Sequence, residues 1–254
     1  MKPRCVLITG ATGAIGGALA REYAAPGVEL LLHGRNAGQL ERIAAECAAL
    51  GATVSACIVD LGDVAQARQW SLDLASRHPV DLLVANAGMN IDIGPDGGGE
   101  HWDDIEALLA LNIRSVIALV DAFLPAMRGR GHGQIALISS LAGYFGLPVT
   151  PSYCASKAAV KAYGEALRGW LGPEGLCVTV VMPGYVESPM CSAMPGPKPF
   201  LWTAERAART IRRGLEKDRA RIAFPFPLSL GTWFLAALPA GLSVRLVRWF
   251  GYHG

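Results

Sequence analysis

The regular alternation of short apolar runs with helix-like stretches is the feature that most constrains the fold. Four such runs come early in the chain, separated by stretches with helical periodicity: "CVLITG", "GVELLLHG", "ATVSACIVD" and "VDLLVANAG". The runs are continuously apolar, as the strands of a parallel sheet covered on both faces require. Repeated β-α units with short connections predict one doubly wound α/β domain with three α/β/α layers, whose ligands bind at the carboxyl ends of the strands.

The same alternation continues through the rest of the chain. A glycine-rich segment, "NIDIGPDGGGEH" at 90–101, predicts an exposed, mobile loop, and a long helix is expected after it at about 102–128. Further helices are predicted at about 152–171 and over "TAERAARTIRRGLEK", with strands over "GQIALISS" and "LCVTVVMPG". The pattern therefore predicts six strands, with no internal repeat and no interdomain linker.

Composition and charge exclude several classes of protein. Apolar residues make up 52% of the 254 residues and charged residues 17%, which argues against a disordered chain. The net charge of +2 gives no reason to expect nucleic acid as a partner. The six cysteines show neither a CxxC pair nor zinc-ligand spacing, so we expect no metal site and a reducing cytoplasm. The opening "MKPRCVLITG" has too short an apolar run for a secretory signal.

The stretch "TGATGAIGG" at 9–17 stands between the first predicted strand and the first predicted helix. A helix N-terminus presents backbone N–H groups that have no partner within the helix, and these groups bind anions such as phosphate. Glycines at this point let the backbone turn tightly and approach a diphosphate closely. A glycine-rich turn alone is a weak signal, but this position within a β-α-β unit favours a nucleotide site.

Over about residues 4–225 the chain resembles the short-chain dehydrogenase/reductase family, which implies a Rossmann-like fold and an oxidoreductase with a nicotinamide cofactor. The usual classical pattern of that family, TGxxxGxG, would place glycines at 10, 14 and 16. This chain has Ala14 there, and Gly10, Gly13 and Gly16 match the TGxxGxxG spacing of the extended branch instead. Because its length and later motifs resemble classical members, we interpret the turn as a local variant in which the Ala14 methyl slightly crowds the diphosphate.

The residues after the second predicted strand bear on the choice between NAD and NADP. Chains of this type that bind NAD usually carry an acid here, but this sequence has "HGRN", with Arg35 and Asn36. The planar guanidinium of Arg35 would attract the 2′-phosphate of NADP(H), so NADP(H) is the predicted cofactor; the alternative is a solvated surface arginine. The resemblance places Asp60 and Leu61, at the end of the third strand, against the adenine, although Asp60 also suits a helix cap.

Tyr153 and Lys157 in "SYCASK" stand four residues apart and so share one face of a helix. A neighbouring ammonium lowers the pKa of a tyrosine, which would make Tyr153 a proton donor or acceptor near neutral pH. The resemblance adds Ser140, thirteen residues before Tyr153, as the group that polarises the substrate oxygen; Ser139 is a neighbour with less suitable spacing. Asn112 in "ALNI" matches the family's asparagine, which holds a water near the lysine.

The resemblance also implies a set of residues around the cofactor. "NAG" at 86–88 matches the family's NNAG turn, and "MPGYVESPM" matches the turn beside the nicotinamide, with Ser188 where the family often has threonine. The predicted cofactor-binding residues are Gly10, Thr12, Gly13, Ile15, Gly16, Arg35, Asn36, Asp60, Leu61, Asn86, Ala87, Gly88, Tyr153, Lys157, Pro183, Gly184, Val186 and Ser188.

A lid over the substrate is implied from about Pro189 to Phe200, a segment that includes Pro195. Apolar side chains in the lid and after Ser140 predict an apolar pocket and mildly favour a lipophilic substrate, although each also suits ordinary packing. These side chains are Met190, Met194, Phe200, Tyr144, Phe145 and Leu147.

The C-terminal segment differs from the rest of the chain. Residues 224–242 carry no charge, and Arg245 and Arg248 follow among apolar residues. This length approaches that of a membrane span, but prolines and glycines interrupt it as one helix. We predict a domain at 1–223 and an extension at 224–254 that packs on the substrate site or a subunit interface. Binding to a membrane surface and true insertion remain the alternatives.

Together these patterns predict an NADP(H)-dependent oxidoreductase that reduces a carbonyl or oxidises the corresponding secondary alcohol. Tyr153 would exchange the proton, Ser140 would polarise the oxygen, and Lys157 with Asn112 would support the proton transfer. The alternatives are an NAD-dependent alcohol dehydrogenase and an NADP(H)-binding sensor or scaffold without turnover. The resemblance further implies a homodimer or homotetramer, formed through the helices at about 102–128 and 152–171. A cytoplasmic location, with membrane association as an option, is expected.

Overall fold

The computed structural model describes residues 2–94, 96–194 and 196–249. Within these residues a parallel sheet of seven strands has the order β3-β2-β1-β4-β5-β6-β7. The order reverses between β1 and β4, which is the point where doubly wound sheets bind ligands. The strands are β1 Cys5–Ile8, β2 Glu29–His33, β3 Thr53–Cys57, β4 Leu82–Ala85, β5 Gly133–Ile138, β6 Leu176–Pro183 and β7 Arg221–Phe224.

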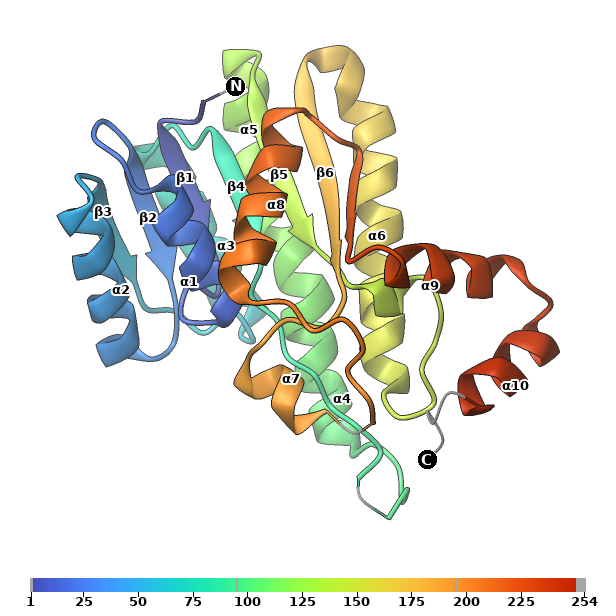
Figure 1. Ribbon diagram of the computed structural model, residues 1–254. Coiled ribbons are helices and arrows are strands. Elements are labelled where there is room, and N and C mark those ends of the chain that lie inside the picture. Colours follow the sequence, from blue (N-terminus) through green and yellow to red (C-terminus); the bar gives the residue numbers. More distant parts are fainter. Residues whose placement is uncertain (1, 95, 195, 250–254) are drawn as a thin grey trace.

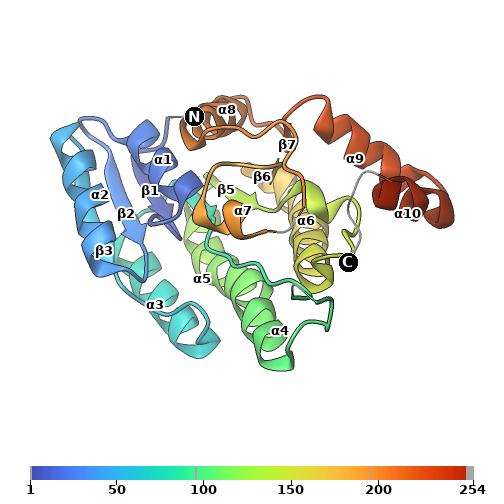
Figure 2. The ribbon, with the colours of Figure 1, turned by 60° about the horizontal axis from the view of Figure 1, so that its bottom comes forward.

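Helices cover both faces of this sheet, so the predicted three-layer α/β/α architecture is confirmed (Figures 1 and 2). Val6 and Ile8 of β1 pack into the core on the side of α1, α2 and α8, whereas Leu7 packs on the side of α3, α5 and α6. The bounds are α1 Ala14–Tyr23, α2 Ala37–Ala49, α3 Val64–Arg77, α4 Trp102–Leu109, α5 Ser115–Arg130, α6 Pro151–Leu171, α7 Pro189–Ala193, α8 Ala204–Glu216, α9 Leu228–Ala237 and α10 Ala240–Trp249.

Two strand predictions were wrong. The sequence pattern gave six strands, but β7 pairs in parallel with β6 and forms the edge of the sheet beyond it. The third strand was expected to run to Asp60, yet β3 ends at Cys57. β3 is the opposite edge strand and is only partly buried, so its apolar run continues as a loop past the last paired residue.

The long helix expected at about 102–128 is present but contains a break in its hydrogen-bond pattern. α4 and α5 are joined by a five-residue π-helical turn, η1, at Ala110–Arg114. Among the described residues, this run, Trp102–Arg130, is the one helix long and apolar enough to cross a membrane, and just over half of its apolar window is buried against the protein. That burial is typical of a core helix of a globular domain.

The last two helices lie at the side of the domain (Figure 1, red). α9 contacts β7 and the short 3₁₀ turn η2, Leu141–Gly143, and α10 packs against α9. The predicted boundary at 223/224 falls just before the last residue of β7, and the division into a domain and an extension stays a prediction. Residues 250–254 of the predicted extension lie outside the described residues.

Candidate active site

The glycine-rich turn between β1 and α1 is held so tightly that side chains do not fit. Gly10 has a positive φ of 66°, and a Cβ on Gly16 would lie 2.3 Å from the carbonyl oxygen of Gly10. α1 begins at Ala14 with Gly13 as its N-cap, and no side chain caps its first turn, unlike α2 and α3. The first N–H groups of α1 are thus left for an anion at the carboxyl edge of the sheet.

Asn86 fixes this turn to the end of β4. Its Nδ2 donates to the carbonyl oxygens of Thr9 at 2.9 Å and Gly10 at 3.1 Å. In return, the Thr9 hydroxyl accepts from the backbone N–H groups of Asn86 and Ala87. The "NAG" turn therefore joins β1 to β4 at the reversal point of the sheet, as its sequence position predicted.

The turn after β2 lies directly against the glycine-rich turn. A Cβ on Gly34 would come within 2.6 Å of Thr12 Cγ2, and Gln39 Nε2 donates to the Thr12 carbonyl at 2.8 Å. Arg35 and Asn36 are exposed beside it. The Asn36 side chain caps α2 by accepting from the Gln39 N–H at 3.0 Å, whereas among the described residues the Arg35 guanidinium makes no such hydrogen bond.

Asp60 and Leu61 take different positions at the end of the third β-α unit. Asp60 is exposed and accepts from the Gly62 N–H at 2.9 Å, while Leu61 is fully buried in the core. The cap of α3 is Asp63, which accepts from the Gln66 N–H, so the alternative of Asp60 as a helix cap is wrong. Asp60 remains available at the edge of the predicted adenine site.

His33 at the end of β2 is a site residue that the sequence analysis missed. It is 3% exposed, its Nδ1 accepts from the Gly10 N–H at 3.3 Å, and its Nε2 donates to the Val59 carbonyl at 2.9 Å. Burial lowers the pKa of His33, which keeps the ring neutral in the tautomer that this bonding needs. No signal except its place at a strand end distinguished it from an ordinary histidine.

Two adjacent serines after β5 have different environments. The Ser139 hydroxyl is buried and donates to the Lys157 carbonyl at 2.7 Å, which fastens β5 to α6. The Ser140 hydroxyl accepts from the Ala142 N–H at 3.1 Å and donates to the Pro183 carbonyl at 3.5 Å, and it lies close enough to Tyr153 to lower the pKa of that phenol. The structure thus brings Ser140, rather than Ser139, to Tyr153, in agreement with the spacing argument.

The start of α6 is held by the preceding loops, and this sets the position of Tyr153. Glu100 accepts from the N–H and the hydroxyl of Ser152 in the first turn of the helix. Thr150, fully buried, donates to Asn90 Oδ1 at 2.7 Å and to the Ile91 carbonyl at 2.6 Å. Both ends of the glycine-rich segment that was predicted to be a mobile loop are therefore hydrogen-bonded to the start of α6.

Lys157 lies on the same face of α6 as Tyr153. Its Nζ is 5.6 Å from the centre of the Tyr153 ring and donates to the Ile138 carbonyl at 3.1 Å. Burial lowers the pKa of Lys157 to about 8. Burial also raises the pKa of Tyr153 to about 12, and the neighbouring Ser140 opposes this only in part. The predicted lowering of the tyrosine pKa was wrong in direction, since loss of hydration outweighs the lowering effect of Ser140.

Asn112 sits in the π-helical turn η1, and its side chain is held by Met89 and Ser156. Asn112 is 1% exposed; its Oδ1 accepts from the Met89 N–H and its Nδ2 donates to the Met89 carbonyl, both at 2.9 Å. A Cβ on Gly88 would lie 3.1 Å from Asn112 Oδ1 and 3.4 Å from Lys157 Nζ. Three predicted residues from three elements therefore meet at one point, and π-helical turns of this kind are frequent at functional sites.

Asn112 Nδ2 also donates to the Ser156 hydroxyl at 3.1 Å, and that hydroxyl donates to the Tyr153 carbonyl at 2.8 Å. Ser156 is fully buried and was not singled out from the sequence. It extends the polar chain from η1 into the turn of α6 that carries the tyrosine.

The segment after β6 closes the site on its other side. The Gly184 N–H donates to the Phe224 carbonyl at 2.7 Å, and a Cβ on Gly184 would lie 2.9 Å from Pro225 and 3.1 Å from Leu228. Val186 is buried, and the Ser188 hydroxyl caps the short helix α7 of the lid segment. Pro183 ends β6 beside them.

The predicted apolar pocket is only partly assembled. Met190 and Phe200 of the lid segment are exposed by 42% and 53%, and Pro195 lies outside the described residues. Tyr144 lines a hollow of about 260 Å³ with Lys161, Arg221 and Trp233, and its hydroxyl accepts from Arg221. A substrate wall formed by the lid side chains stays a prediction.

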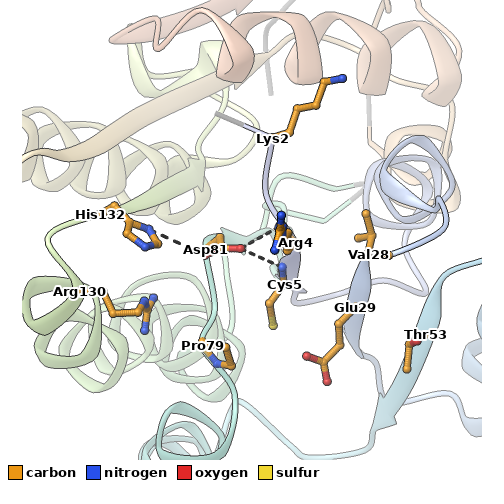
Figure 3. Close-up of a pocket in the computed structure, with 11 residues that line it drawn as sticks. Lys2, Arg4, Cys5, Val28, Glu29, Thr53, Pro79, Asp81, Arg130 and His132 are labelled. Atoms are coloured by element: carbon orange, nitrogen blue, oxygen red, sulfur yellow. Dashed lines mark hydrogen bonds and ion pairs between the residues drawn. The ribbon is translucent and has the colours of Figure 1, made fainter.

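A larger hollow, of about 710 Å³, lies at the opposite edge of the sheet, where β1, β2 and β3 begin (Figure 3). At its centre Asp81 accepts from the backbone N–H groups of Arg4 and Cys5. Arg130 and His132 line one side. None of the predicted site residues borders this hollow, so size alone does not locate the chemistry.

The family model of short chain dehydrogenases matches residues 4–196. The chain belongs to the short-chain dehydrogenase/reductase family. This membership and the fold make it an oxidoreductase of the family's general type. A Myxococcus xanthus protein named an uncharacterized oxidoreductase is 33% identical over 243 residues, which is 94% of each chain.

Two solved structures are similar over most of the chain. A short-chain dehydrogenase from Sphingobium yanoikuyae in complex with NADPH has a TM-score of 0.82 and 26% identity, and the match covers 94% of this chain and 95% of that one. A putative NAD(P)-dependent gluconate 5-dehydrogenase from Beutenbergia cavernae with bound NADP has a TM-score of 0.77 and 28% identity, covering 87% and 94%. The uncapped α1 and its glycine-rich turn fall within the family match.

Proposed function

We propose that this oxidoreductase uses NADP(H) to interconvert a ketone and the corresponding secondary alcohol. The single observation that carries the proposal is the meeting of three side chains at the carboxyl edge of the sheet: Lys157 Nζ lies 5.6 Å from the centre of the Tyr153 ring, and Ser140 is close enough to lower the pKa of Tyr153. A polarising hydroxyl, a proton donor and an ammonium side by side are the groups that carbonyl reduction needs.

The residues present fit a dinucleotide. The glycine-rich turn excludes side chains and leaves the N–H groups of α1 uncapped, which suits a diphosphate. Exposed Arg35 beside Thr12 suits a 2′-phosphate, and Asp60 and the "NAG" turn border the same edge. Two similar structures hold NADPH and NADP, which supports the same cofactor here. When bound, the nicotinamide supplies or accepts the hydride.

The protein's own residues would manage the proton. Because burial raises the pKa of Tyr153 to about 12, its hydroxyl carries a proton at neutral pH, as a donor to a carbonyl oxygen must. Ser140, which lies beside that hydroxyl, would donate to the same oxygen and orient it. Burial lowers the pKa of Lys157 to about 8. As Tyr153 gives up its proton, the phenolate would favour the charged ammonium of Lys157, and the ammonium would stabilise the phenolate.

Asn112 is placed to complete the proton route without itself titrating. Its amide is held by Met89 and Ser156, and it approaches the lysine across Gly88. A polar path from Tyr153 through Lys157 to Asn112 would return the proton from solvent. The exposed apolar side chains of the lid segment, Met190 and Phe200, support a lipophilic substrate that they would cover.

Two further proposals come from the family resemblance. A homodimer or homotetramer would form through α4, α5 and α6, and exposed Trp102, Ile117 and Trp170 on these helices support that surface. A cytoplasmic location suits the six cysteines, all of which are free thiols in the described structure.

The proposed function is tested by offering a panel of ketones of increasing size with NADPH and following loss of NADPH absorbance. We expect turnover of at least one lipophilic ketone by the wild-type protein and by a Tyr163→Phe variant, and none by Tyr153→Phe. Tyr163 lies on the same helix α6 and serves as the matched control. NADPH binding without turnover across the panel, with alcohols and NADP also inert, would favour the sensor or scaffold alternative.

A further inference from the structure

The C-terminal helices α9 and α10 expose an unusual amount of apolar surface. On them and the preceding loop, large apolar side chains are between 41% and 79% exposed. These are Phe226, Leu230, Trp233, Phe234, Leu242, Val244 and Trp249. Figures 1 and 2 show both helices projecting from the side of the domain. Large exposed apolar side chains gathered on one small part of a protein usually mark a partner.

α9 is the more unusual of the two helices. Its ten residues, LSLGTWFLAA, include no charged residue, and none of the ten is buried. A helix that is apolar all round is normally enclosed by a protein core or by lipid. Leu230 and Phe234 stand four apart and so form an exposed row along one face. In the described structure, α9 therefore lacks the apolar surroundings that such a helix normally has.

The pair is nevertheless a folded unit attached to the domain. Leu228 packs with Leu141 and Met182 beside the turn that follows Ser140. The Ser243 hydroxyl of α10 is buried and donates to the Leu235 carbonyl of α9 at 2.8 Å. The exposed side chains are therefore presented on fixed helices.

The charges of this segment indicate what covers it. No aspartate or glutamate follows Asp218, and the cations beyond β7 are Arg245 and Arg248, both exposed on α10. A two-fold contact between copies through this unit would bring these arginines together with no acid of the segment to pair with them. A surface rich in anionic phosphates would satisfy them while taking up the apolar side chains.

We propose that α9 and α10 bind the surface of an anionic phospholipid bilayer. Each helix has ten residues and Pro239 separates them, which is too short for either to span the hydrocarbon core. They would lie in the interface, with apolar side chains among the acyl chains and the arginines at the phosphates. This binding is independent of the catalytic proposal, and its test requires no turnover.

Flotation of the full chain with lipid vesicles tests the proposal. We expect the wild-type protein to float with phosphatidylcholine vesicles containing phosphatidylglycerol, and to float much less with phosphatidylcholine alone. A Leu230→Ser/Phe234→Ser/Leu242→Ser variant should lower the partition coefficient at least roughly 10-fold, since three apolar side chains leave the lipid. Trp102→Ser, at a 68% exposed position on α4, is the control and should float as wild type.

The charge requirement has its own variant pair. Arg245→Gln/Arg248→Gln should weaken binding roughly 5-fold per arginine on the anionic vesicles and very little on phosphatidylcholine. Arg209→Gln/Arg213→Gln, which removes two exposed arginines of α8, should have no comparable effect. Equal losses for both pairs would show general charge attraction and overturn the assignment to α9 and α10.

Two other results would also overturn it. In the first, the wild-type protein stays at the bottom of the gradient with both vesicle types, and light scattering shows an oligomer that dissociates in the triple-serine variant. The surface is then a subunit interface. The other is absence of quenching by brominated lipid. We expect such quenching in the wild type and its loss in Trp233→Phe/Trp249→Phe, although four other tryptophans remain in that variant.

Discussion

The proposed active site and the C-terminal helices depart from ordinary burial in opposite directions. At the site, Lys157 and Asn112 are polar and buried, and each has a hydrogen-bonding partner. On α9, Leu230 and Phe234 are apolar, and each is more than half exposed. Buried polar groups cost stability and exposed apolar groups promote association, so each region is explained by something that it binds. We propose that the first region carries out a reaction and that the second binds a membrane surface.

The largest effect expected at the buried region is on turnover. Tyr153→Phe should lower kcat by about 10²–10⁴-fold, because it removes the proton donor while keeping the ring. NADPH binding should stay close to that of the wild type, as measured by fluorescence titration. A variant that keeps more than about a tenth of the wild-type kcat would contradict the role of Tyr153 as proton donor. The buried polar region would then not be explained by catalysis.

The next effect concerns cofactor choice at the exposed margin of the site. Arg35→Ala should weaken NADPH binding roughly 10–100-fold and NADH binding much less, since a charged hydrogen bond to phosphate is lost. Arg42→Ala, an exposed arginine of α2 a short distance along the chain, is the control. Equal weakening of both cofactors would place Arg35 outside the 2′-phosphate site and favour the NAD-dependent alternative.

A pH-dependent effect on stability follows from the buried lysine. Lys157→Met should abolish turnover yet raise the free energy of unfolding at pH 7 by about 2 kcal/mol, since a buried charge is removed and one hydrogen bond is lost. Burial lowers the pKa of Lys157 from 10.5 to about 8, so from pH 8 to 10.5 only the unfolded wild-type chain keeps this proton. Wild-type stability from this group therefore rises with pH across that window.

Urea unfolding of both proteins at several pH values measures this. The advantage of Lys157→Met should shrink as the pH rises from 8 towards 10, before Tyr153 begins to ionise in the unfolded chain. A difference in stability that is the same at every pH would show that Lys157 is not strained by burial.

The smallest expected effect is at the exposed region. Phe234→Ser should change the free energy of unfolding by less than about 0.5 kcal/mol, because the side chain is already 55% exposed. Phe123→Ala, at a buried position of α5, should cost about 3–5 kcal/mol in the same thermal or urea unfolding measurement. A loss of more than 1 kcal/mol for Phe234→Ser would mean that α9 is packed more firmly than its exposure shows.

The sequence predicted most of the sheet because its central strands are long apolar runs. β1, β2, β4, β5 and β6 all lie within the predicted ranges. β7 was missed because its four residues, RIAF, follow a charged stretch and precede Pro225. Only pairing with β6 makes it a strand, and pairing between distant segments leaves no local pattern. The π-helical turn at Asn112 likewise has no sequence signature.

The sequence predicted where the site residues lie better than it predicted their pKa values and hydrogen-bond partners. Helical periodicity placed Tyr153 and Lys157 on one face of a helix, and the family resemblance added Ser140. The direction of the Tyr153 pKa was predicted wrongly because burial depends on all surrounding elements. His33 and Ser156 were missed for the same reason, since their partners come from other segments: the Gly10 N–H for His33 and the Asn112 amide for Ser156.

Because Gly184 has no side chain, the turn after β6 packs directly against the segment that follows β7. Pro225 and Leu228 occupy the space that a side chain at 184 would need. A grafted C-terminal segment must therefore match this shape, and a larger residue placed at 184 to reshape the substrate entrance would push the final helices outward. Redesign of selectivity and redesign of anchoring are consequently a single problem in this molecule.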